Sequence, residues 1–200
     1  MNIYIINGSA TSGKSTFCKQ VCRLIYPYGE ELSTVDLVKK LAQEAGWDGK
    51  KTPEARRGLS NLKDVLTVWL DAPVNDIKKS INNKVCWFDS YGMDIEKLTF
   101  FINVREPDEI RRLCEEFNAK SIRVIRDVAD NAWASNHADA DVKFYDYDIY
   151  IDNNEGLEQL AMTALDFVKK ENLPLRKGTF KFDENWNFKY NNIIEKQRRN

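Results

Sequence analysis

Cysteine and histidine are scarce in this chain, which has four cysteines and one histidine among its 200 residues. No pair among Cys18, Cys22, Cys86 and Cys114 has the C-x-x-C spacing of a zinc or redox motif. Cys18 and Cys22 are one helical turn apart, but no histidine or further cysteine near them completes a set of metal ligands. We therefore expect reduced cysteines that pack inside a cytoplasmic protein, in the host cytoplasm if a virus encodes it.

Long apolar runs are also missing, as is an excess of charge of one sign. No segment has the length of apolar sequence that a membrane-spanning helix needs, and the N-terminus does not resemble a signal peptide, so we expect no membrane contact. The net charge of −1 argues against binding of nucleic acid. An apolar content of 42% is enough for a globular domain with a three-layer core.

A phosphate-binding motif lies near the start of the chain. Residues 3–6 form a β-branched and aromatic run that predicts a buried strand, and a helical pattern begins after the motif. Between them, residues 8–15 match G-x-x-x-x-G-K-[ST] at every fixed position. Backbone N–H groups and the helix dipole bind phosphate in such a loop, so we expect Lys14 to contact the β- and γ-phosphates of ATP and Ser15 to bind Mg²⁺. The predicted nucleotide-binding residues are Gly8, Ser9, Ala10, Thr11, Ser12, Gly13, Lys14, Ser15 and Thr16.

Strand and helix patterns alternate along the rest of the chain. Further strands are predicted at residues 30–33, 99–104, 121–126 and 148–151, and clear helices at 34–45, 53–70, 106–117 and 155–170. Residues 74–98 are expected to be mostly helical. This alternation predicts a five-stranded parallel sheet with helices on both faces, the three-layer α/β/α P-loop nucleoside-triphosphate hydrolase fold of nucleotide-kinase type.

Two segments interrupt this alternation. Residues 127–146 are polar and lie between two strands, as expected of a lid that closes over bound phosphates. Residues 174–200 follow the kinase domain predicted over 1–173, and their alternating aromatics around a polar turn predict a hairpin with one aromatic face. That face either packs on the domain or forms a contact between two copies in a homodimer.

Two arginines are expected at the carboxyl ends of strands, where ligands bind in open α/β sheets. Arg105 follows the strand at 99–104, and Arg126 ends the strand at 121–126. Guanidinium groups there can clamp two phosphorylated substrates and neutralise charge during phosphoryl transfer, so both are predicted to be catalytic with Lys14. A guanine-binding N-K-x-D motif is absent, because the similar run at residues 61–64 has its residues in another order.

The order of these features resembles a known family. The phosphate-binding loop is followed by S-T-V-D-x-V-K, an arginine-bearing helix, V-R-E-P-D-E-I, R-V-I-R, a lid with the single histidine, and I-D-N-N-E-G-L-E-Q-L. This order is similar to that of phage-type deoxynucleoside monophosphate kinases and of the related animal-type phosphomevalonate kinases. The resemblance extends to about Lys170 and implies ATP-dependent phosphorylation of a small molecule that already carries phosphate, most simply a nucleoside monophosphate.

The resemblance also implies roles for single residues. It places Arg105 at the arginine of the family's D-x-R motif, with Asn103 where the family has an aspartate. Asp89 or Asp36 is then expected to supply the carboxylate that orients Mg²⁺. The lid lacks arginine, so Arg123 and Arg126 would clamp the substrates from their strand. The predicted acceptor-binding residues are Ser33, Asp36, Lys39, Arg56 or Arg57, and Arg123.

These observations predict a kinase that uses ATP and Mg²⁺ to phosphorylate a nucleoside monophosphate, with small molecules as its partners. Two other hypotheses remain open at this point. The acceptor is another small phosphorylated metabolite, or the chain is a nucleotide-dependent interaction protein that transfers no phosphate. Asn103 and the arginine-poor lid keep the last of these open.

Overall fold

The computed structural model describes residues 1–50, 52–132, 145–177, 179–182 and 188–191. The chain divides into two compact units, one comprising Met1–Glu31 with Glu96–Asn200 and the other Leu32–Ile95. The phosphate-binding loop belongs to the first unit, and most of the predicted acceptor-binding residues belong to the second. The domain boundary predicted after residue 173 stays a prediction.

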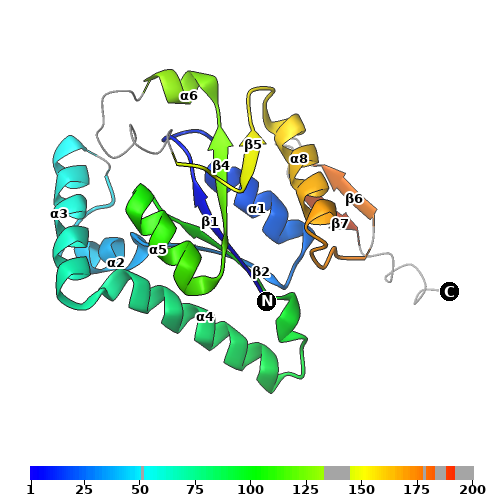
Figure 1. Ribbon diagram of the computed structural model, residues 1–200, viewed down its shortest axis with the longest axis horizontal. Coiled ribbons are helices and arrows are strands. Elements are labelled where there is room, and N and C mark those ends of the chain that lie inside the picture. The colour runs from blue at the N-terminus through cyan, green and yellow to red at the C-terminus, as the bar shows by residue number, and fades with distance from the viewer. Residues whose placement is uncertain (51, 133–144, 178, 183–187, 192–200) are drawn as a thin grey trace. The chain divides into compact units, whose positions relative to one another are not determined.

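A five-stranded parallel sheet forms the centre of the first unit (Figure 1). Its strands are β1 (Asn2–Asn7), β2 (Gly29–Ser33), β3 (Thr99–Asn103), β4 (Lys120–Ile125) and β5 (Ile149–Asp152), in the order β2-β3-β1-β4-β5. β1 pairs with β3 through Ile6 and Asn103, and with β4 through Asn7 and Arg123. The carboxyl ends of these strands therefore meet around the loop that leaves β1, which confirms the predicted five-stranded parallel sheet of a P-loop fold.

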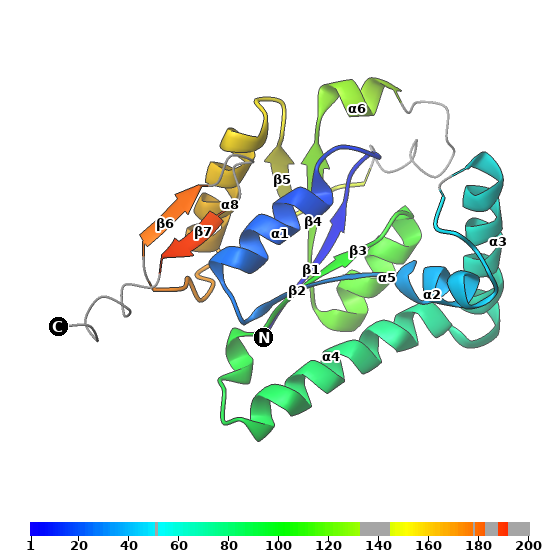
Figure 2. The same cartoon turned by 180° about the vertical axis from the view of Figure 1, so that it is seen from behind.

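Helices cover the sheet on both faces. α1 (Lys14–Leu24) packs on α8 (Leu157–Lys170) on one face, and α5 (Pro107–Phe117) packs on β1 and β4 from the other. Figures 1 and 2, which view the sheet from opposite sides, show α5 in front of it in the first view and α1 in front in the second. Strand alternation turns Tyr4 and Ile6 toward α1 and α8, where Phe17 and Phe167 meet Tyr4 and Phe101 in a core of stacked and edge-on rings.

Helices dominate the second unit. α2 (Asp36–Glu44), α3 (Pro53–Leu70) and α4 (Ala72–Ser90) contact one another. Thr52 caps α3, because its Oγ1 accepts a hydrogen bond from the Ala55 N–H at 3.2 Å, and Pro53 occupies the first helical position. Asp71, with φ of +49°, separates α3 from α4 at the break that the sequence predicts. α4 and a 3₁₀ turn at Ile95–Lys97 bear out the mostly helical character expected of residues 74–98.

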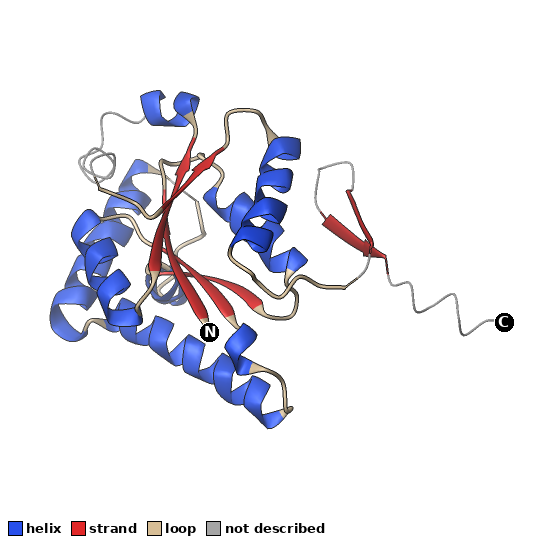
Figure 3. Ribbon diagram, turned by 45° about the vertical axis from the view of Figure 1, so that its right-hand side comes forward, coloured by secondary structure: helices blue, strands red, loops and turns tan. Residues whose placement is uncertain are grey.

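The two segments outside the alternating pattern are described in part. α6 (Asp127–Ala132) begins the predicted lid, and residues 133–144, with His137, lie outside the described residues. The predicted hairpin is present as β6 (Thr179–Phe182) and β7 (Phe188–Asn191), an antiparallel pair in which Phe180 is opposite Tyr190 (Figure 3). Its backbone register is described but its side chains are not, so the role of the aromatic face stays open. Among the described helices, none has the length and apolar character needed to cross a membrane.

Candidate nucleotide-binding site

The loop from β1 to α1 is shaped by glycines that no other residue could replace without displacing neighbours. Gly8 has φ of +147°, and a Cβ there would lie 2.4 Å from the Val124 carbonyl oxygen. Gly13, with φ of +100°, caps α1, and a Cβ there would lie 2.3 Å from Asn153 Nδ2. The loop therefore keeps a concave backbone surface at the N-terminus of an 11-residue helix, which is the arrangement that binds phosphate.

Lys14 lies over this loop at the first residue of α1. Its ammonium donates hydrogen bonds to the Gly8 carbonyl and, at 2.9 Å, to the Ser9 carbonyl. The next residue, Ser15, is exposed in the first turn of the helix. A positive charge and a hydroxyl are thus presented beside the loop, as the motif predicts for phosphate and Mg²⁺.

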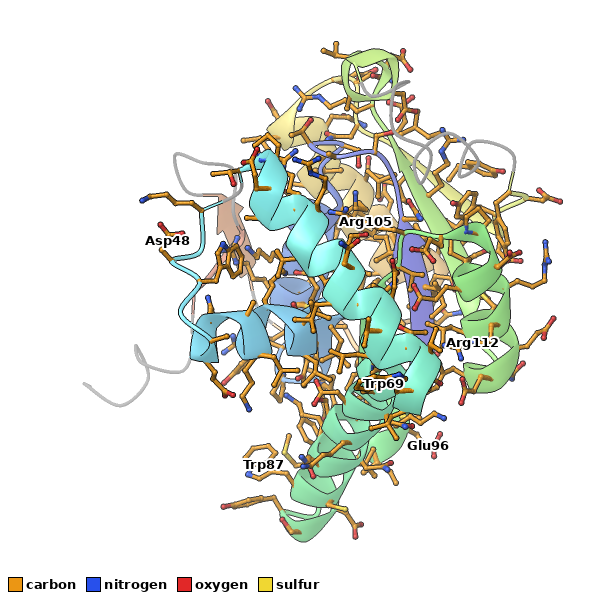
Figure 4. All side chains as sticks on the ribbon, turned by 90° about the vertical axis from the view of Figure 1, so that its left-hand side faces the viewer. Asp48, Trp69, Trp87, Glu96, Arg105 and Arg112 are labelled. Carbon is orange, nitrogen blue, oxygen red and sulfur yellow. The ribbon has the colours of Figure 1, made fainter. Side chains whose placement is uncertain are left out.

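Asn7 ties the loop to the end of β3. Its buried amide donates from Nδ2 to the Arg105 carbonyl at 2.9 Å and accepts from the Gly8 N–H through Oδ1. The backbone of Arg105, which is labelled in Figure 4, is therefore fixed to the start of the loop, while its side chain is exposed. Arg105 follows β3 at its carboxyl end, as the sequence predicts, and its ligand-binding and catalytic roles stay predictions.

A cavity opens beside the loop on the side of β4 and β5. Its volume is about 310 Å³, at the lower end of the range for small-molecule sites. Arg126 borders it and donates from Nη1 to the Thr11 carbonyl at 3.3 Å. The lining residues are Thr11, Gly13, Lys14, Ser15, Thr16, Arg126, Asn153, Leu157 and Leu160. The structure thus brings Arg126 together with much of the predicted nucleotide-binding loop.

Arg123 lies in a different environment from Arg126. Its guanidinium forms an ion pair with Asp130 of α6 at 3.1 Å, and the two side chains are only 11% and 10% exposed. Asp130 also accepts a hydrogen bond from the Ser9 hydroxyl, so it joins β4 and α6 to the phosphate-binding loop. The acceptor contact predicted for Arg123 stays a prediction, but the buried pair favours a role in positioning the loop.

Asn153 is a site residue that the sequence did not single out. It follows β5, is buried, and donates from Nδ2 to the Ser12 carbonyl at 2.7 Å. Its neighbour Asn154 accepts from the Asp127 N–H at 2.8 Å, so the β5–α8 connection is fixed to both the loop and the start of α6. The feature of the sequence that could have indicated Asn153 is the group of polar residues directly after a predicted strand.

The predicted acceptor-binding residues are partnered within the second unit. The Ser33 hydroxyl accepts from the Val35 N–H at 3.4 Å, Lys39 pairs with Asp36 at 3.2 Å, and Arg57 pairs with Glu54 at 3.8 Å. Arg56 is exposed near the start of α3. Exposed ion pairs contribute little free energy, so the Lys39 and Arg57 side chains can leave theirs for an anionic ligand at little cost.

The residues available to Mg²⁺ are few, and they fit an ion that is held mostly by phosphate oxygens. No cluster of three or more acidic, histidine or cysteine side chains is found among the described residues. Asp36 lies on α2 and Asp89 on α4, both exposed in the second unit. Mg²⁺ in kinases is bound by one or two protein groups together with substrate phosphates and water, so the Ser15 hydroxyl at the edge of the glycine-shaped loop suits it.

Comparison with known proteins does not show a family for this chain. No protein-family model and no curated protein sequence matches the chain. Its structure is similar to a sugar kinase from a Janibacter species, with a TM-score of 0.41 and 14% identity over 84% of this chain and 95% of that one. It is also similar to shikimate kinase from Bacteroides thetaiotaomicron, with a TM-score of 0.44 and 10% identity over 86% of this chain and 99% of that one. At these scores and identities the likeness does not bear on substrates.

Proposed function

We propose that this chain is an ATP-dependent kinase that transfers the γ-phosphoryl group to a nucleoside monophosphate. The observation that carries the proposal is the loop at the N-terminus of α1, with Lys14 over its carbonyls and Arg126 at the cavity beside it. Loop amides, the helix dipole and two cations in one place are suited to a polyphosphate chain. The resemblance to phage-type deoxynucleoside monophosphate kinases supports this choice of acceptor.

In this proposal the residues of the site act by alignment and charge neutralisation. An oxygen of the acceptor phosphate, already anionic at neutral pH, attacks the γ-phosphorus of ATP. The bond from that phosphorus to the bridging oxygen breaks, and ADP leaves with the electron pair. Lys14, Arg105 and Arg126 offset the negative charge on the oxygens during transfer, so no strong general base is needed.

Ser15 would hold Mg²⁺, which would supply electrostatic shielding between the phosphate groups. The acceptor contacts assigned to Ser33, Asp36, Lys39 and Arg56 or Arg57 rest on the resemblance. Arg123 acts indirectly in this proposal, because its ion pair with Asp130 holds α6 and Ser9 in place.

A coupled ADP-release assay with a panel of acceptors tests the proposal. We expect turnover with at least one nucleoside or deoxynucleoside monophosphate. Turnover only with another phosphorylated metabolite would show that the proposed acceptor is wrong and that the proposed kinase activity is right. Tight ATP binding without turnover on any acceptor would favour the nucleotide-dependent interaction protein.

Arg105→Ala separates a kinase from a binding protein. Its exposed side chain can be removed without disturbing Asn7, because Asn7 donates to the backbone carbonyl of Arg105. We expect kcat to fall by about 10²–10⁴-fold, as for removal of a transition-state cation, with ATP affinity nearly unchanged. Arg111→Ala, which removes an exposed arginine on α5, is the matched control and should leave kcat unchanged. Equal kcat for wild type and Arg105→Ala would remove this residue from the mechanism.

A further inference from the structure

The end of β3 carries an amide where the family resemblance implies an aspartate, and a carboxylate from the neighbouring strand contacts that amide. Asn103 donates from Nδ2 to Oε1 of Glu31 on β2 at 2.9 Å. Both residues belong to the first unit, as does the phosphate-binding loop. A neutral amide cannot replace the charge of an aspartate, but it can hold a neighbouring carboxylate in a fixed orientation.

The side of β2 that carries Glu31 faces α1. A Cβ on Gly29 would lie 2.8 Å from the Cα of Cys22, so odd-numbered residues of this strand point at the helix. Glu31 therefore points the same way, and Glu30 points to the opposite face. Asn103 likewise shares a face with Phe101, which packs in the core beneath α1.

The helix presents one stripe of residues to this strand. Ser15, Cys18 and Cys22 follow one another at spacings of three and four, so they lie along one side of α1. Because the helix of a β-α-β crossover runs antiparallel to its strands, moving from Gly29 to Glu31 along β2 corresponds to moving from Cys22 toward Ser15 along α1. Two residues of a strand rise about 6.6 Å, the length of between four and five helical residues, so Glu31 is level with Cys18, one turn from Ser15.

Electrostatics at Cys18 agree with this placement. Burial raises the pKa of the Cys18 thiol, the nearby charge of Glu31 raises it further, and the charge of Lys14 lowers it. The carboxylate and the ammonium therefore both lie within electrostatic range of the same sulfur, one turn below Ser15. A negative charge beneath the Ser15 hydroxyl is what a hydrated divalent cation on that hydroxyl would favour.

We propose that Glu31 is the carboxylate that orients the hydrated Mg²⁺ of the nucleotide complex, and that Asn103 is the positioning residue that holds it. This inference rests on the proposed function, because it requires ATP at the loop. It places the carboxylate that orients Mg²⁺ on β2 instead of β3, within the first unit. Neither Asp36 nor Asp89 then has this role.

The test measures metal affinity rather than activity. Mn²⁺ replaces Mg²⁺ as the probe, and its binding to the ATP-bound protein is followed by electron paramagnetic resonance. Glu31→Gln keeps the size of the side chain and an oxygen for Asn103, but removes the charge. We expect Mn²⁺ affinity to fall about 10–100-fold, while ATP affinity in EDTA stays at the wild-type value. Glu30→Gln, on the opposite face of the same strand, is the matched control and should change neither.

A charge swap provides an independent check. Asn103→Asp in the Glu31→Gln background restores a carboxylate to this hydrogen-bonded pair and should recover most of the lost Mn²⁺ affinity. Unchanged Mn²⁺ affinity in Glu31→Gln, with ATP binding intact, would overturn this inference and leave the kinase proposal standing. Equal losses in Glu30→Gln and Glu31→Gln would also overturn it, since the effect would then be a general one of net charge. A wild-type protein that binds no ATP would overturn both proposals together.

Discussion

Gly13 is where the geometry of the loop depends most directly on one residue. Its φ of +100° is unfavourable for any residue with a Cβ, and that Cβ would lie 2.3 Å from Asn153 Nδ2. We expect Gly13→Ala to displace Asn153 from the Ser12 carbonyl and to weaken ATP binding at least about tenfold, a loss of about 1.4 kcal/mol, in isothermal titration calorimetry.

Gly46→Ala is the matched control for this change. Gly46 has nearly the same φ, +102°, but nothing lies within 4 Å of the Cβ position. The backbone cost of about 1 kcal/mol is therefore common to both variants, and the contact with Asn153 is not. Equal ATP affinity in the two variants would show that the contact with Asn153 has no part in binding.

The sequence could predict the loop residues because the motif has fixed spacing and each position has a local physical role. It could not predict Asn153 or Asp130, since these reach the loop from residues more than a hundred positions away. Nothing in the local pattern around Asp130 distinguishes it from the exposed Asp127 three residues earlier. Only the pairing of β4 with β1 brings Arg123 and Asp130 to Ser9.

At the scale of elements, a buried charge pair joins α6 to β4, and Asp130 of this pair also joins α6 to the phosphate-binding loop. Removing Asp130 takes away the carboxylate that faces the Arg123 guanidinium, which is only 11% exposed. We expect Asp130→Ala to lower the free energy of unfolding by about 3 kcal/mol, measured by urea denaturation. ATP affinity should fall as well, because the Ser9 hydroxyl loses its acceptor.

Asp108→Ala is the control for this prediction. Asp108 forms an exposed pair with Arg111 at 3.6 Å on the surface of α5. Its removal should leave the denaturation midpoint almost unchanged, because exposed pairs contribute little. A similar midpoint for Asp130→Ala and Asp108→Ala would contradict the proposed role of the buried pair.

The elements themselves were largely predictable. Each predicted strand of the central sheet is present, because β-branched and aromatic runs between turn residues are strong signals. The division of the chain into two units was not predicted, since α2, α3 and α4 have the same amphipathic character as helices that cover a sheet. Which helices group together depends on contacts between distant residues, which a pattern within one helix does not record.

For the whole molecule, thiol and phenol groups with raised pKa values should lower the stability at alkaline pH. Burial raises the pKa of the Cys114 thiol to about 11, the hydrogen bond with Tyr145 lowers it, and the charges of Asp148 and Glu115 raise it. The unfolded chain releases this proton nearer pH 8.5, so the folded state binds more protons between the two values. The stability that Cys114 contributes is therefore present below about pH 8.5 and is lost as pH rises toward 11.

Urea denaturation at pH 8 and pH 10.5 tests whether stability decreases as pH rises. The urea concentration at the unfolding midpoint of the wild type should be lower at pH 10.5 than at pH 8. In Cys114→Ser, whose hydroxyl does not titrate in this range, this decrease should be smaller. Cys86→Ser removes an exposed thiol and should behave as wild type. Burial also raises the pKa of Tyr4 and Tyr147, so part of the alkaline loss should remain in Cys114→Ser. A larger decrease of the midpoint in Cys114→Ser than in wild type would contradict the stabilising contribution predicted for Cys114.

Binding of ATP should stabilise the whole molecule, because a ligand that binds only the folded state shifts the unfolding equilibrium by mass action. At a free concentration of one hundred times Kd the gain is about 2.7 kcal/mol, which corresponds to about 5–10 °C in Tm for a chain of this size. Differential scanning calorimetry with Mg²⁺ and ATP should detect this shift in wild type and in Arg105→Ala.

Lys14→Ala should lose this shift in Tm, because the ammonium that lies over the Gly8 and Ser9 carbonyls is removed. Lys19→Ala, an exposed lysine further along α1, should keep the full shift. A shift of equal size in Lys14→Ala would mean that ATP binds elsewhere, and no shift in wild type would mean that the loop does not bind ATP.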